Sequence, residues 1–76
     1  MAELDPLDPL ADQLASVVAL RELAGQLEDG AVESALRAGW TWTNVAAALG
    51  VTRQAVHKKH LVRVVLAGID LRRRNG

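Results

Sequence analysis

The 76-residue chain contains no cysteine, phenylalanine or tyrosine. The absence of cysteine excludes disulfide frameworks, thiolate zinc sites and thiol catalysis, and it suits a reducing compartment. Two tryptophans are the only aromatic residues, and the apolar half of the chain is mostly Ala, Leu and Val. We therefore expect a small core of aliphatic contacts between helices, with oligomerisation as a further source of stability.

Long hydrophobic runs are also missing. No apolar stretch approaches the length needed to cross a bilayer. The first ten residues, MAELDPLDPL, are acidic and interrupted by proline, whereas a secretory signal starts with basic residues and continues with an apolar stretch. These features predict a cytoplasmic protein that has no membrane partner.

Signatures of catalysis are absent from the sequence. It has no Gly-rich phosphate loop, no carboxylate pair in an apolar setting and no nucleophile with a recognisable base. His57 and His60 are three residues apart on one expected helix, but no cysteine or carboxylate lies near them in sequence to complete a metal site. The sequence predicts a non-enzyme with no catalytic residue, no metal and no cofactor.

Charge is strongly divided along the chain, although the net charge is zero. Residues 1–33 carry eight acidic side chains and one basic, whereas residues 34–76 carry eight basic and one acidic. Such asymmetry between halves indicates a surface that faces a polyanion, opposite an acidic surface.

The first part of the chain reads as a tail followed by a long helical segment. Two Asp-Pro steps disfavour helix before residue 10, so residues 1–9 are predicted to be a flexible acidic tail. From Leu10 the apolar residues recur every three or four positions. Gly30 interrupts this pattern, which fits either one helix from Leu10 to Ala38 or two helices meeting near Gly30. Gly39 can adopt the left-handed conformation that ends the segment.

Two further helices are expected after Gly39. The first has Thr41 as its N-cap and stops at Gly50, and the second begins after the N-cap Thr52. Residues 61–67 are rich in β-branched side chains and fit either a strand or more helix; we expect helix to about Ala67. Residues 10–68 then form one domain, and residues 69–76 form a basic tail.

The predicted fold is all-α, a long leading helix or helix pair followed by a helix-turn-helix. In this motif the second of two short helices enters the major groove of DNA. Ala46 is small where the two helices cross, and Gly50 permits the turn between them. Apolar residues should lock the two helices together: Val45, Leu49, Val51 and Val56. Leu61 or Val62 should extend this inward face.

The stretch from Gly39 to Lys59, GWTWTNVAAALGVTRQAVHKK, resembles the helix-turn-helix of small bacterial transcriptional regulators. It is also similar to the DNA-reading region of sigma factors and to homeodomain-like motifs. Two positions depart from the pattern. Lys59 stands where an aliphatic residue often faces the core, and Asn44 stands where a capping-box Glu is common.

The resemblance implies which residues contact DNA. Arg53 and Gln54 would read base edges, as Arg pairs with guanine and Gln with adenine, and His57 would lie at the next position. Other residues would contact phosphates: Thr41, Thr43, Thr52, Lys58, Lys59 and Arg63. The run Arg72, Arg73 and Arg74 would clamp the DNA backbone or enter a minor groove, and it fits equally a solvated tail with no fixed partner.

The expected function is sequence-specific binding of double-stranded DNA by a bacterial transcriptional regulator. The apolar stripe from Leu10 to Leu27 adds the expectation of a homodimer that reads two half-sites about 34 Å apart. Trp40 and Trp42 are expected to cover the motif as core residues, with room for one of them to be half exposed. The alternative is a protein-interaction module, in which the acidic amino-terminal half binds a protein partner and the helix-turn-helix is a scaffold.

Overall fold

The computed structural model describes residues 8–71, and these form three helices and no strand. Helix α1 spans Pro9–Arg37, α2 spans Trp42–Leu49 and α3 spans Arg53–Leu66. The predicted all-α fold with a long leading helix is confirmed. The alternatives left open by the sequence are also resolved, because α1 runs unbroken through Gly30 and the residues after Leu61 continue α3 as helix.

Local chemistry accounts for both ends of α1. Asp8 is the N-cap, and its carboxylate accepts a hydrogen bond from the Leu10 backbone N–H at 2.8 Å. Pro9 follows in the first turn, where its missing N–H costs nothing. After the C-cap Ala38, Gly39 takes φ +96°, the left-handed conformation expected there.

The short helix α2 has a complete capping box. Thr41 Oγ1 accepts a hydrogen bond from the Asn44 backbone N–H at 3.1 Å, and Asn44 Oδ1 accepts one from the Thr41 backbone N–H at 3.2 Å. Asn44 therefore does what Glu usually does at this position. Gly50, with φ +72°, ends the helix and turns the chain toward α3.

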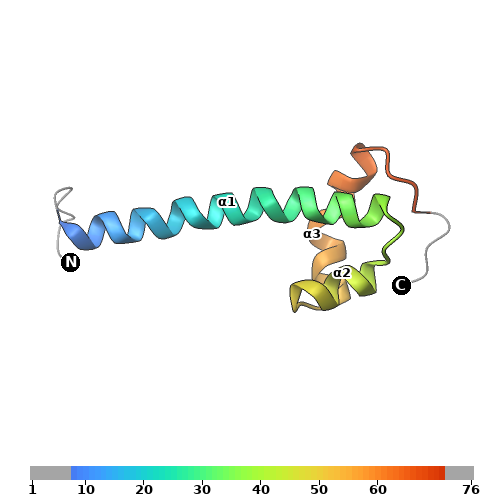
Figure 1. Ribbon diagram of the computed structural model, residues 1–76, viewed down its shortest axis with the longest axis horizontal. Coiled ribbons are helices and arrows are strands. Elements are labelled where there is room, and N and C mark those ends of the chain that lie inside the picture. The colour runs from blue at the N-terminus through green and yellow to red at the C-terminus, as the bar shows by residue number, and fades with distance from the viewer. Residues whose placement is uncertain (1–7, 72–76) are drawn as a thin grey trace.

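The core lies where α2 and α3 pack against the last third of α1 (Figure 1). Its buried apolar residues come from all three helices and from the segment after α3: Val32, Leu36, Trp42, Val45, Ala46, Val56, Val64 and Ile69. Ile69 is only 8% exposed, so the core extends one residue past the domain end expected from the sequence. We call the unit formed by residues 28–71 the head.

Two expected core positions lie on the surface instead, as does Val62, which was the alternative to Leu61 on the inward face of α3. Val62 is 70% exposed, and Leu49 and Val51 are 39% and 47% exposed. The inward row of α3 is Val56, His60 and Val64, so a histidine, which was not expected in the core, lies between the two buried valines. Leu61 packs at the edge of the core.

The first two thirds of α1 extend away from the head, with no other described element beside them (Figure 1). The molecule accordingly measures 54 × 22 × 18 Å. No helix among residues 8–71 combines the length and the apolarity that crossing a bilayer requires.

Candidate nucleic-acid interface

The first turns of α3 carry several of the side chains that the sequence resemblance predicts to contact DNA. Thr52 is the N-cap, and its hydroxyl oxygen accepts a hydrogen bond from the Ala55 backbone N–H at 3.1 Å. Arg53, Gln54 and Lys58 are all exposed on the first turns that follow. Lys58 forms no ion pair within residues 8–71.

His57 lies on the flank of this surface. Its ring is partly buried and meets Trp42 edge-on, with ring centroids 5.1 Å apart and an interplanar angle of 77°. Such a contact is favourable because the positive edge of one ring faces the negative face of the other. The His57 ring therefore packs against the buried Trp42. It is less accessible to a ligand than the side chains of Gln54 and Lys58 are.

Two basic residues predicted to contact phosphates, both more than half exposed, also pair with carboxylates of α1. Lys59 Nζ lies 2.9 Å from Glu28 Oε2, and Arg63 Nε donates to Glu33 Oε1 at 2.9 Å. Arg63 Nη1 also lies 3.8 Å from Asp29 Oδ2. These pairs join residues about thirty positions apart and hold the back of α3 against α1.

His60 is the centre of this contact and was not predicted to have a role. Its side chain is buried, with Nε2 2.6 Å from Glu28 Oε2 and Nδ1 3.4 Å from Asp29 Oδ1. Each ring nitrogen thus faces a carboxylate, so this buried polar group has partners on both sides. We call Glu28, Asp29, Glu33, Lys59, His60 and Arg63 the polar clamp.

The polar clamp changes two acid–base equilibria. The hydrogen bond from Lys59, followed by that from His60, holds the pKa of the Glu28 carboxyl below its ordinary value. The same bond to Glu28 raises the pKa of the Lys59 ammonium. Both shifts favour the ionised pair near neutral pH.

The predicted threonines lie at helix starts. Thr41 and Thr52 are N-caps of α2 and α3, and Thr43 is exposed in the first turn of α2. Helix N-termini carry backbone N–H groups and a partial positive charge, which suit phosphate oxygens. The predicted contacts of Arg72, Arg73 and Arg74 lie outside the described residues.

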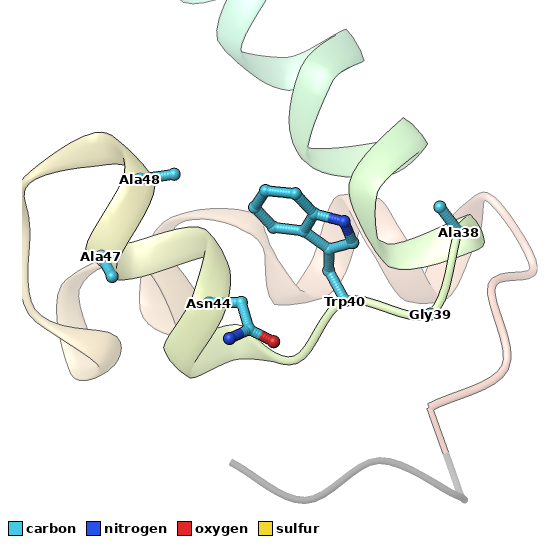
Figure 2. A pocket seen from close by; sticks show the side chains of 6 residues that line it. All are labelled: Ala38, Gly39, Trp40, Asn44, Ala47 and Ala48. Carbon is cyan, nitrogen blue, oxygen red and sulfur yellow. The ribbon is translucent and has the colours of Figure 1, made fainter.

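Trp40 separates two surface hollows at the junction of α1 and α2. The first, of about 440 Å³, is lined by Asn44, Ala47, Ala48 and the turn after α1 (Figure 2). The second, of about 420 Å³, is an apolar groove between the two helices. It is lined mainly by small or apolar residues, including Ala31, Ala35, Trp40, Val45 and Leu49. Trp40 is 45% exposed, whereas Trp42 is buried in the core as expected.

Residues 8–71 contain no group of three or more His, Cys, Asp or Glu side chains that could hold a metal ion. The carboxylates around His60 are engaged with Lys59 and Arg63, as described above. The structure thus exposes polar and basic side chains at the start of α3. The polar clamp attaches another face of the same helix to α1.

Three curated proteins, from Mycobacterium bovis and from two strains of Mycobacterium tuberculosis, are similar to the chain and are named only as uncharacterized. Each is 33% identical over 66 residues, which cover 87% of this chain and 26% of the relative. The chain thus spans about a quarter of the length of the curated relatives it matches. No family model matches the chain. No solved structure matches it either.

Proposed function

We propose that the chain binds double-stranded DNA sequence-specifically, with the start of α3 in the major groove, and that it acts as a transcriptional regulator. The observation that carries the proposal is the exposed face at the start of α3. There Arg53, Gln54 and Lys58 project from a helix that α1 and α2 support from behind. An α-helix fits the major groove of B-form DNA, and its N-terminal residues reach the base edges.

The residues of this face fall into two roles. Arg53 and Gln54 read bases through bidentate hydrogen bonds, while Lys58 contacts a phosphate. The N-terminal ends of α2 and α3, with Thr41, Thr43 and Thr52, approach the DNA backbone. Lys59 and Arg63 position α3 through the polar clamp, because their charges are already paired with α1.

The direction of the acidic side chains favours DNA over a protein partner for the acidic half. Glu28, Asp29 and Glu33 are turned toward α3 and paired there. In the described part of α1 before them, Asp8, Asp12 and Glu22 are spread over four turns and are offset by Arg21. They do not form the dense acidic surface that a basic protein partner would require.

The test is retention of random-sequence duplex DNA at two salt concentrations, followed by selection and sequencing of the retained DNA. We expect an enriched motif. We expect Arg53→Ala and Gln54→Ala each to weaken binding to it by about 1 to 3 kcal/mol and to relax preference at one base. Lys58→Ala should lower affinity for all sequences and reduce the salt slope by about 1.

Gln26→Ala is the matched control, because Gln26 is an exposed glutamine of α1 on a different part of the molecule. It should leave DNA binding unchanged. Circular dichroism of each variant verifies that the fold is intact. If the wild-type chain retains no DNA even at low salt, the proposal is wrong, and the search turns to protein partners.

A further inference from the structure

The apolar surface of α1 outside the head has no partner within residues 8–71. Between Leu10 and Leu27 the helix carries seven large apolar side chains, and each is between 42% and 66% exposed. Only three charged residues interrupt this stretch, Asp12, Arg21 and Glu22. Scattered apolar side chains are normal on a monomer surface, but a continuous apolar patch marks an interaction site.

Part of this surface has the spacing of a coiled coil. From Leu10 to Ala31, residues at alternating steps of three and four lie along one face of α1. All of them are apolar except Gln13, which lies between Leu10 and Val17. We call this row the seam: Leu10, Val17, Leu20, Ala24, Leu27 and Ala31. At its carboxyl end the seam runs into the apolar groove between α1 and α2, because Ala31 lines that groove together with Ser34 and Ala35.

We propose that the seam binds the seam of a second copy of this chain in an antiparallel coiled coil. The two helices are paired so that Leu10 of one copy lies beside Ser34 of the other. In this register Val17 meets Leu27 and Leu20 meets Ala24. The amino-terminal turns of each α1 then cover the groove beside Trp40 of the other copy.

Side-chain size favours this orientation over a parallel one. The antiparallel register places a large residue against a smaller one at Leu10–Ser34 and at Leu20–Ala24, which gives layers of similar volume. A parallel pair in register would place Leu20 against Leu20 and Ala24 against Ala24, so that crowded layers alternate with hollow ones. Close-packed interiors disfavour both crowding and voids.

Charge and space favour the same orientation. The described amino-terminal half of α1 is acidic, with Asp8, Asp12 and Glu22 against Arg21, and a parallel pair would bring two such halves together. The antiparallel pair separates Asp8 and Asp12 of the two copies, and Glu22, which lies level with Glu22 of the other copy, is on the face of α1 opposite the seam. The antiparallel pair also places the exposed Leu10 and Leu14 of each copy at the open groove of about 420 Å³ in the other, whereas a parallel pair would crowd both heads at one end.

The first test is sedimentation equilibrium of the full 76-residue chain without DNA, so that its result is independent of the DNA-binding proposal. We expect a dimer. Leu20→Glu should shift the chain toward monomer by placing two charges in the seam. The matched control Ala15→Glu adds the same side chain on the opposite, exposed face of α1 and should leave the dimer intact. A wild-type chain that sediments only as a monomer would overturn the proposal.

Disulfide cross-linking tests the orientation, and the native chain has no cysteine to interfere. Leu10→Cys and Ser34→Cys are prepared separately, mixed and oxidised. The antiparallel register predicts covalent dimers only in the mixture, because a disulfide needs its two Cβ atoms within about 4.5 Å. Covalent dimers of Leu10→Cys alone would show a parallel pair. A dimer that forms no cross-link in the mixture would exclude the proposed register.

Discussion

His60 shows how one buried side chain joins two helices that are distant in the sequence. It is 1% exposed and contacts both Glu28 and Asp29. Buried polar groups stabilise a fold only when their hydrogen-bonding atoms are satisfied, and here both ring nitrogens face carboxylates. The side chain therefore fills space in the core and fixes the rotation of α3 at the same time.

His60→Ala should lower the free energy of unfolding by about 2 to 4 kcal/mol, because it leaves a cavity and removes the hydrogen bond to Glu28. Urea denaturation followed by circular dichroism measures the change. His57→Ala is the control, since His57 is only partly buried, and it should cost less. Equal losses for the two variants would contradict the central role of His60.

Glu28 should make stability depend on acid. Its pKa is lowered in the folded chain by Lys59 and His60, so the folded state binds its proton more weakly than the unfolded state does. The stabilisation is then complete near neutral pH and is lost as the pH falls below about 4. The raised pKa of Lys59 makes stability depend on alkaline pH as well. Its stabilisation is complete below the ordinary pKa of lysine and is lost as the pH rises through the raised value.

We expect Glu28→Gln to destabilise the chain at pH 7 and to flatten the fall in stability between about pH 5 and 3. Thermal unfolding at several pH values measures both effects. Glu22→Gln changes an exposed carboxylate with no pair in the described residues and should leave the profile close to that of the wild type. A profile for Glu28→Gln that is as steep as the wild-type profile would contradict the assignment.

At the scale of elements, α1 is longer than the head needs. Only its last third contributes buried residues, Val32 and Leu36. Isolated helices are marginally stable in water, so the exposed two thirds depend on continuity with the head and, in our proposal, on a second α1. Gly25 and Gly30 lower the intrinsic helix propensity of this element further.

Gly30→Ala should raise the free energy of unfolding by about 0.5 to 1 kcal/mol, because alanine is the better helix former. A Cβ atom at this position meets nothing within 4 Å. The matched change Gly50→Ala should destabilise the chain by about 1 to 2 kcal/mol, since Gly50 has φ +72° and a side chain there is strained. Chemical denaturation measures the free energy of unfolding of both variants. Changes of the same sign for Gly30→Ala and Gly50→Ala would contradict this explanation.

At the scale of the whole molecule, the proposed dimer sets the distance between two heads. With Leu10 of one copy beside Ser34 of the other, the two Ser34 residues, one in each head, are 24 residues apart along α1, which is about 36 Å. The seam and the core face of α1 at Val32 and Leu36 are about a third of a turn apart. A two-fold axis perpendicular to the helix pair therefore places both heads on the same side.

This spacing matches one turn of B-form DNA, about 34 to 36 Å. Once a half-site is known from selection, two inverted copies with centres about 10 base pairs apart should bind far more tightly than one copy. Adding about 5 base pairs between them turns the second site to the opposite face of the duplex and should abolish the gain. Electrophoretic mobility shift measures the affinities. Equal affinity at both spacings would contradict the dimer geometry without affecting DNA binding by a single head.

Local sequence was sufficient to predict the helix boundaries. Thr41, Thr52, Gly39 and Gly50 act through contacts with their own neighbours, so their capping and turn conformations follow from a few adjacent residues. The continuity of α1 through Gly30 was not decided locally, because glycine weakens a helix without forbidding it.

The sequence by itself thus determined the fold class, the caps and the exposed residues at the start of α3, since these depend on short-range chemistry and spacing. The tertiary structure alone decided that His60 is buried and that Lys59 and Arg63 pair with Glu28 and Glu33. Those contacts join positions about thirty residues apart, and their existence depends on the angle at which α3 crosses α1. That angle is set by the packing of the whole core, which no local pattern encodes.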